Sequence, residues 1–179
     1  MEIRMAKQED LPILFTMDHH IETDFLTRAV LEKRVFVAEL AGIVGWLRYS
    51  YFWESIPFMD MLVVVEEQRH RGYGSKLVDY FEQYLKELGH TVVMTSTSAV
   101  ENSQHLYYQL GYQAVGGFFP VDEPYELLLR KELSTNQKTG GARINTCFFK
   151  GEKFLIHDCL FSCCQVKSDK DSESFLKQG

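Results

Sequence analysis

The residues with the clearest chemical potential lie between Gln68 and Ser75, in the sequence QRHRGYGS. Two glycines separated by one residue, Gly72 and Gly74, let backbone N–H groups approach an anion closely. The segment that follows has helical spacing, so the start of its helix adds unpaired N–H groups and the positive end of a dipole. This pattern predicts a phosphate-binding turn. The alternative is an ordinary glycine-rich turn between a strand and a helix.

Arg69 and Arg71 add positive charge that suits a polyphosphate. Two common nucleotide-binding motifs do not fit the segment. The dinucleotide motif G-x-G-x-x-G lacks its third glycine, because Leu77 stands there. The P-loop motif requires a Gly-Lys-Ser/Thr ending, which is also missing.

The elements that must position this turn alternate between strands and helices. Residues 57–65, PFMDMLVVV, are too apolar for a strand with one wet face, so they predict a central strand. Asp10 is expected to cap the first helix, and Gly89 to end the third. The predicted order βααβββαβαββ indicates an α/β (α+β) fold with a mixed, mostly antiparallel sheet flanked by helices. The predicted strands are 2–6, 34–40, 43–52, 57–65, 90–96, 112–118 and 125–133, with two helices up to about 33, one through Leu77 to Leu88, and one over 101–110.

Composition limits the class of protein. The chain has 179 residues, 45% hydrophobic and 25% charged, which is ordinary for one globular domain. A net charge of −6 argues against a nucleic-acid-binding surface. No apolar run reaches the roughly 18 to 20 residues that span a bilayer, and the first residues do not resemble a signal peptide. All four cysteines follow residue 146, which predicts a reducing, cytoplasmic setting.

Residues 134–179 differ in character from residues 1–133. Residues 134–143, STNQKTGGAR, are polar and predict a linker between a domain at 1–133 and a tail. The sequence FFKGEKFLI predicts a hairpin around Lys150 and Gly151. The spacing of the tail's candidate ligands disfavours a zinc site and favours reduced thiols, so no metal is expected; these ligands are His157, Cys159, Cys163 and Cys164.

Two segments resemble the GNAT superfamily of N-acetyltransferases. LVVVEEQRHRGYGSKL, from Leu62 to Leu77, is similar to the family's core strand, [RQ]-x-x-G-x-[GA] turn and helix. NSQHLYYQLGY, from Asn102 to Tyr112, is similar to its Asn…Leu-Tyr-x-x-Leu-Gly-Phe element. The predicted element order agrees as well. The resemblance covers residues 1–133.

The resemblance implies that acetyl-CoA is the co-substrate and lies in a V-shaped opening between the strands predicted at 57–65 and 90–96. Backbone groups of Leu62, Val63 and Val64 would pair with the pantetheine arm. Asn102 would supply a further contact. The diphosphate would rest on the turn residues Arg69, His70, Arg71, Gly72, Tyr73, Gly74 and Ser75.

Tyr107 aligns with the family tyrosine that faces the departing sulfur, which implies that it assists the CoA thiolate. With ordinary pKa values of ~10 for the phenol and ~8.5 for the thiol, full proton transfer is uphill by about 2 kcal/mol. Hydrogen bonding to the thiolate is therefore favoured. Two alternatives stay open: Tyr107 is a core residue, or the neighbouring Tyr108 faces the opening.

An attacking amine must first lose a proton, which at pH 7 costs roughly 4 to 5 kcal/mol for a pKa of ~10.4. Asp60, an acid within an apolar central strand, is the best candidate for the base. It could instead lie at an edge or pair with Arg48 across the hairpin. Glu22 and Glu54 are weaker candidates.

The sequence thus predicts direct acetyl transfer to an amine, with no acyl-enzyme, because residues 1–146 contain no cysteine. The backbone N–H of Val64 is the first candidate for binding the oxyanion. The acceptor, a small-molecule or peptide amine, is left open, as is a homodimer. The alternatives are a non-catalytic acyl-CoA-binding regulatory module and an interaction protein that works through its tail.

Overall fold

The computed structural model describes residues 1–133, 146–149 and 152–155. Contacts divide the chain into two units, residues 1–136 and 137–179. In the second unit, β8 (Thr146–Phe149) pairs with β9 (Glu152–Leu155) in antiparallel register, as the predicted hairpin requires. The turn of that hairpin and the tail's proposed thiol cluster lie outside the described residues.

The first unit contains a seven-stranded sheet in the order β1-β2-β3-β4-β5-β7-β6, so the apolar strand β4 is central, as predicted. The mixed, mostly antiparallel fold is confirmed. Its strands are β1 (Glu2–Met5), β2 (Val35–Glu39), β3 (Ile43–Phe52), β4 (Ile56–Val64), β5 (Val92–Ser98), β6 (Gln113–Phe118) and β7 (Glu126–Glu132). Its helices are α1 (Leu11–Met17), α2 (Thr23–Leu31), α3 (Tyr73–Glu87) and α4 (Ser103–Gln109), with short 3-10 turns η1 (Gln8–Asp10) and η2 (Glu66–Gln68).

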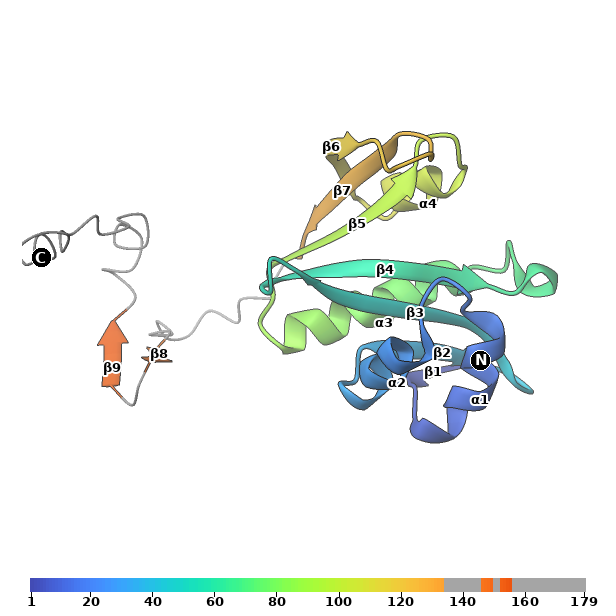
Figure 1. Ribbon diagram of the computed structural model, residues 1–179, viewed down its shortest axis with the longest axis horizontal. Coiled ribbons are helices and arrows are strands. Elements are labelled where there is room, and N and C mark those ends of the chain that lie inside the picture. Colours follow the sequence, from blue (N-terminus) through green and yellow to red (C-terminus); the bar gives the residue numbers. More distant parts are fainter. Residues whose placement is uncertain (134–145, 150–151, 156–179) are drawn as a thin grey trace, which may run out of the picture. The chain divides into compact units, whose positions relative to one another are not determined.

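Helices cover both faces of the sheet (Figure 1). On one face, α1 and α2 pack through Leu14 and Leu26 against β2 and β3. On the other, α3 packs through Phe81 against β2, β3 and β4, and α4 adds Tyr107 to the same core. Side chains alternate between faces along a strand, so neighbours on β3 and β4 belong to different cores. That alternation determines which residues can meet at the site.

The strands β4 and β5 pair over a short length and then separate (Figure 1). Their parallel register contains the pairs Phe58/Met94 and Met59/Thr95. Beyond them β4 continues to Val64, still paired with β3, without a further pair to β5. One edge of the second half of β4 is therefore available for backbone hydrogen bonds to something other than β5. This is the V-shaped divergence that the resemblance implied.

A β-bulge lies where the two strands begin to separate. Arg48 of β3 is opposite Met61, whereas the next residue, Tyr49, is opposite Met59. Asp60 is thus the extra residue on β4. Bulges bend a strand and redirect a side chain, and they occur often beside active sites.

Candidate active site

A turn joins β4 to α3 at the wide end of the divergence. It ends at Gly72, whose φ of 77° lies in the left-handed region. The first hydrogen bond of α3 runs from the N–H of Lys76 to the carbonyl oxygen of Gly72, at 3.1 Å. The N–H groups of Tyr73, Gly74 and Ser75 therefore have no partner within the helix. Three donors and the positive end of a helix dipole meet at the place predicted for a diphosphate.

The side chains of the turn add charge on its solvent side. Arg69, His70 and Arg71 are exposed. Nε of Arg69 donates to the carbonyl oxygen of Val64 at 3.0 Å, which ties the turn to the end of β4. Arg69 therefore shapes the turn while its terminal nitrogens remain able to contact an anion, and Arg71 is the second cation available for phosphate.

Gly72 and Gly74 should respond differently to alanine. Gly72→Ala should destabilise folding by about 1 kcal/mol, because a left-handed backbone disfavours a side chain, and should weaken acetyl-CoA binding by distorting the turn. Gly74→Ala should not destabilise folding, because a Cβ there meets its nearest neighbour, Cδ2 of Leu106, at an ordinary 3.7 Å. Urea unfolding and calorimetry with acetyl-CoA would measure both effects. Equal effects of the two substitutions on folding would contradict this account of the turn.

Tyr107 lies near the closed end of the divergence. Tyr107 is 6% exposed, whereas Tyr108 is 43% exposed, so the helix directs Tyr107 inward. The neighbouring Thr95 belongs to the last β4/β5 pair, and its Oγ1 donates to the carbonyl oxygen of Met59 at 2.9 Å. Burial raises the pKa of Tyr107 to about 12, and the hydroxyl of Thr95 acts in the opposite direction. The phenol is therefore a hydrogen-bond donor throughout the neutral pH range.

Asp60 lies in a small polar network on the α1/α2 face of the sheet. Oγ of Ser50 donates to its Oδ1 at 2.7 Å, and Nη1 of Arg48 approaches its Oδ2 at 3.4 Å. The same Arg48 donates through Nε to Oδ2 of Asp18 at 3.2 Å. The cross-hairpin pairing with Arg48 is therefore present. The side chain of Asp60 is 23% exposed and that of Asp18 is fully buried, so only Asp60 is accessible to a second molecule.

The surroundings of Asp60 raise the pKa of its carboxyl above the ordinary value, because partial burial penalises the charged form. The hydrogen bond from Ser50 and the charges of Arg48 and Arg34 act in the opposite direction, and Asp18 adds a small upward contribution. A carboxylate with a raised pKa is a stronger proton acceptor than a carboxylate with the ordinary pKa. Such a carboxylate, partly accessible and beside a bulge, suits a general base.

The other predicted residues lie on the second half of β4 and just before α4. Leu62 packs toward the α3 side and Val63 toward the α1/α2 side, which holds the unpaired stretch of β4 between two cores. Asn102 precedes α4, is exposed, and makes no side-chain capping bond. Its amide is thus accessible to a ligand, although it lies on a different element from the turn that precedes α3.

Three functional candidates were not identified from the sequence: Thr95, Ser50 and Asp18. Each acts through a partner at least ten residues away, on another strand or helix. No local motif contains them. The register of β3, β4 and β5 brings Ser50 and Thr95 to the site, and the packing of α1 on the sheet brings Asp18.

Two negative observations concern the described residues alone. Within them, no group of three or more histidine, cysteine, aspartate or glutamate side chains could hold a metal ion. None of the described helices has the length and apolar character needed to span a membrane.

The Acetyltransferase (GNAT) family matches residues 4–112 of this chain. Among solved structures, Ard1 from Thermoplasma volcanium superposes with a TM-score of 0.65 at 15% identity, over 74% of this chain and 97% of that one. The ribosomal-protein-S18-alanine N-acetyltransferase from Escherichia coli gives 0.64 at 13% identity, over 79% and 99%. The Salmonella typhimurium protein yncA, solved with its cofactor acetyl-CoA, gives 0.64 at 16% identity, over 82% and 99%.

A comparison with curated proteins found no match. The structural relatives share the fold at low identity, and the family match covers most of the domain, including the turn at residues 68–75 and α4. Members of this family are acetyl-CoA-dependent N-acetyltransferases. With its divergent central strands, the glycine turn that leads into α3 and its tyrosine-bearing helix, the chain belongs to the GNAT family of acetyltransferases.

Proposed function

We propose that the chain transfers an acetyl group from acetyl-CoA directly to an amine. The observation that carries this proposal is the separation of β4 from β5 after the Met59/Thr95 pair. The phosphate turn lies at the open end and Tyr107 near the closed end. The five residue-to-residue steps from Met59 to Val64 span roughly 16 Å of strand. A pantetheine arm extended along that edge would carry the thioester from the turn toward Tyr107.

In this proposal Tyr107 donates a hydrogen bond to the departing sulfur. A phenol whose pKa is about 12 holds its proton more tightly than a thiol of pKa ~8.5. Complete transfer to the thiolate would be uphill by about 5 kcal/mol. A hydrogen bond from the neutral phenol stabilises the developing charge without that cost. The proton that CoA finally acquires then comes from the attacking amine or from solvent.

The oxyanion of the tetrahedral intermediate needs a donor close to Tyr107. Val64, at the far end of β4, already accepts a hydrogen bond from Arg69 through its carbonyl group. Its N–H is several residues away from the Met59/Thr95 pair, too far for a thioester whose sulfur contacts Tyr107. We therefore place the oxyanion against the backbone N–H of Leu62, just after the bulge, because N–H directions alternate along β4 and the N–H of Val65 faces β3.

Asp60 is the proposed base, acting directly or through a water molecule. Its carboxylate lies on the α1/α2 face together with Arg48 and Ser50, so the amine would approach from that face. Arg48 is held by the buried Asp18 and positions Asp60. No cysteine occurs before residue 147, so direct attack is favoured over an acyl-enzyme.

The first experiment is calorimetry of the full chain with acetyl-CoA, followed by thiol release from acetyl-CoA with a panel of amines. The panel should include peptides that begin with alanine, because two solved relatives are named as ribosomal-protein alanine N-acetyltransferases. It should also include diamines and aminoglycosides. Binding with amine-dependent thiol release is the expected result.

The outcomes separate the proposal from its alternatives. Tight binding without thiol release for any amine would favour a non-catalytic acyl-CoA-binding regulatory module. Absence of binding to any acyl-CoA would contradict the proposed site itself. Cytoplasmic localisation stays a prediction from the cysteine distribution.

A further inference from the structure

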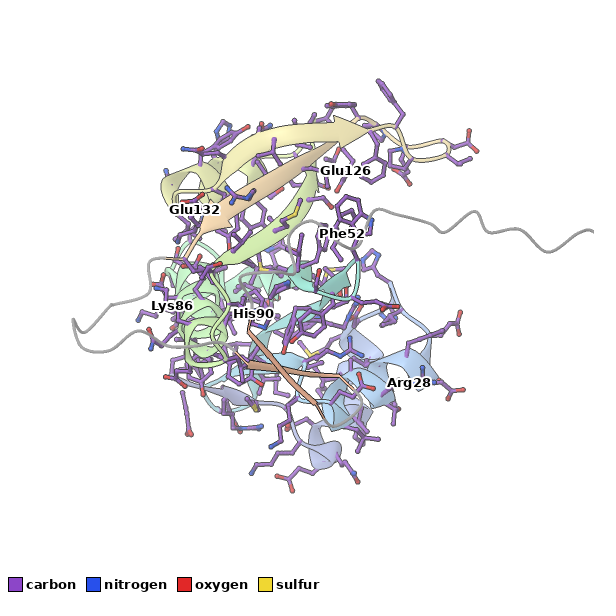
Figure 2. The ribbon with its side chains drawn as sticks, turned by 90° about the vertical axis from the view of Figure 1, so that its left-hand side faces the viewer. Arg28, Phe52, Lys86, His90, Glu126 and Glu132 are labelled. Atoms are coloured by element: carbon purple, nitrogen blue, oxygen red, sulfur yellow. The ribbon has the colours of Figure 1, made fainter. Side chains whose placement is uncertain are left out.

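A solvent-open cavity of about 470 Å³ lies at the end of α3 opposite to the predicted phosphate turn. Figure 2 views this end of the domain, where Phe52 of β3, Lys86 of α3 and His90 just after α3 are labelled. The cavity is formed by the segment between α2 and β2, the β3–β4 hairpin and the last turn of α3. Its polar and aromatic lining consists of Glu32, Arg34, Tyr49, Tyr51, Glu54 and Tyr84.

The cavity is separate from the proposed acetyl-transfer site. Tyr49 packs against Phe81 of α3, with ring centroids 4.9 Å apart, so the cavity lies on the α3 face of the sheet. The residues on either side of Tyr49 in β3 are Arg48 and Ser50, which contact Asp60 on the opposite face. The sheet therefore stands between the tyrosine part of the cavity and the candidate base, while Arg34 of the lining is near enough for its charge to lower the pKa of Asp60.

Three tyrosines provide the aromatic part of the cavity. The rings of Tyr49 and Tyr51 meet edge to face, 5.8 Å apart at 73°. Tyr84 packs edge-on against Phe36, with centroids 5.3 Å apart. Burial, with smaller contributions from Tyr51 and Tyr84, raises the pKa of Tyr49, which keeps this phenol neutral. Neutral aromatic faces carry partial negative charge, which attracts cations.

The charged residues of the cavity leave an excess of negative charge. Arg34 is already engaged: its Nε donates to Oε2 of Glu32 at 2.8 Å and its Nη1 to the carbonyl oxygen of Tyr49 at 3.2 Å. Glu54 forms no ion pair within the described part of the chain. With two glutamates and one arginine, the lining has a net charge of −1.

The backbone of the hairpin turn fixes Glu54 beside the cavity. Both Trp53 (φ 49°) and Glu54 (φ 57°) are in the left-handed region, which is unfavourable for residues with side chains. Such strain is maintained by the surrounding structure and is found more often at functional positions. A relaxed turn would have needed glycine or asparagine at these positions.

We infer that this cavity binds a small organic cation, with its ammonium group near Glu54 and its alkyl part against Tyr51 and Tyr84. The volume is within the range of small-molecule sites, about 300 to 1,000 Å³. Arg34 does not oppose the cation, because Glu32 neutralises it. The site would let the protein sense an amine independently of the amine that it acetylates.

The experiment is a titration of the ¹⁵N-labelled full chain with n-butylammonium, followed by two-dimensional NMR. Butyrate and n-butanol serve as probes of equal length without the positive charge. The expected result is saturable shifts for n-butylammonium at the amides of Tyr51, Glu54 and Tyr84, and no comparable shifts for the other two probes. Equal binding of butyrate or n-butanol, or cation-induced shifts spread over all acidic residues, would overturn the inference.

Variants test the proposed contacts. Glu54→Gln and Tyr51→Leu should each weaken n-butylammonium binding by roughly fivefold, because each removes one favourable interaction with the cation. Glu67→Gln, an exposed acid in η2, is the matched control and should leave binding unchanged. Asp60→Asn should also leave it unchanged; a loss there would place the cation at the acetyl-transfer site and overturn the inference. Acetyl-CoA affinity, measured in parallel, reports separately on the proposed function.

Discussion

Replacing Tyr107 with phenylalanine should lower kcat by roughly 100- to 1,000-fold, because the sulfur loses its hydrogen-bond donor in the transition state. The ring and its packing remain, including the edge contact with Tyr112 at 5.7 Å. Affinity for acetyl-CoA should therefore change by no more than about twofold, since the diphosphate and pantetheine contacts are elsewhere. Thiol release with an active amine measures the first quantity and calorimetry the second.

Tyr108→Phe is the matched control, because Tyr108 is the next residue on α4 and is exposed. It should keep full activity. If Tyr108→Phe lost activity while Tyr107→Phe kept it, the hydrogen-bond donor to the sulfur would be Tyr108, and the proposed role of Tyr107 would be wrong. Because the pKa of Tyr107 is raised to about 12, its protonation should not appear in pH profiles of the parent enzyme below about pH 11.

The turn, the helix after it and the central strand could be predicted from the sequence, because each is specified by residues that are close together in the chain. The helical spacing from Leu77 to Leu85 and the glycines at 72 and 74 identify a turn followed by a helix without any knowledge of distant partners. The apolar run in β4 identified the central strand for the same reason. The α4 motif then placed Tyr107, although only the structure shows that it faces inward and Tyr108 outward.

Long-range pairing could not be predicted in this way. The bulge at Asp60 depends on how β4 pairs with β3, and no residue type in β4 specifies it. Asp10 shows the same limit: it was expected to cap a helix, but its carboxylate forms an ion pair with Arg4 at 2.7 Å and accepts a bond from the N–H of Lys7. A cation from β1 supplies a stronger partner than the helix N–H groups, and sequence spacing gives no sign of it.

The second large effect is expected at Asp60. Asp60→Asn should lower kcat/KM by roughly 100-fold near neutral pH, because the amide cannot accept the amine's proton. It should keep acetyl-CoA affinity, and it can still accept a hydrogen bond from Ser50. In the parent enzyme kcat/KM should rise as pH increases through the pKa of Asp60, since the carboxylate is the active form. That acidic limb should be missing in the variant.

Ser50→Ala separates a catalytic role of Asp60 from a structural one. The hydrogen bond from Ser50 lowers the pKa of Asp60, so its removal should raise that pKa further. The acidic limb of kcat/KM should then move to higher pH, with activity retained above it, where Asp60 is ionised in both proteins. Arg48, Arg34 and Asp18, the other charged groups that influence Asp60, are unchanged by this substitution. If Asp60 only anchors Arg48, the pH profile of Ser50→Ala should match that of the parent, and the base must be sought elsewhere on the α1/α2 face.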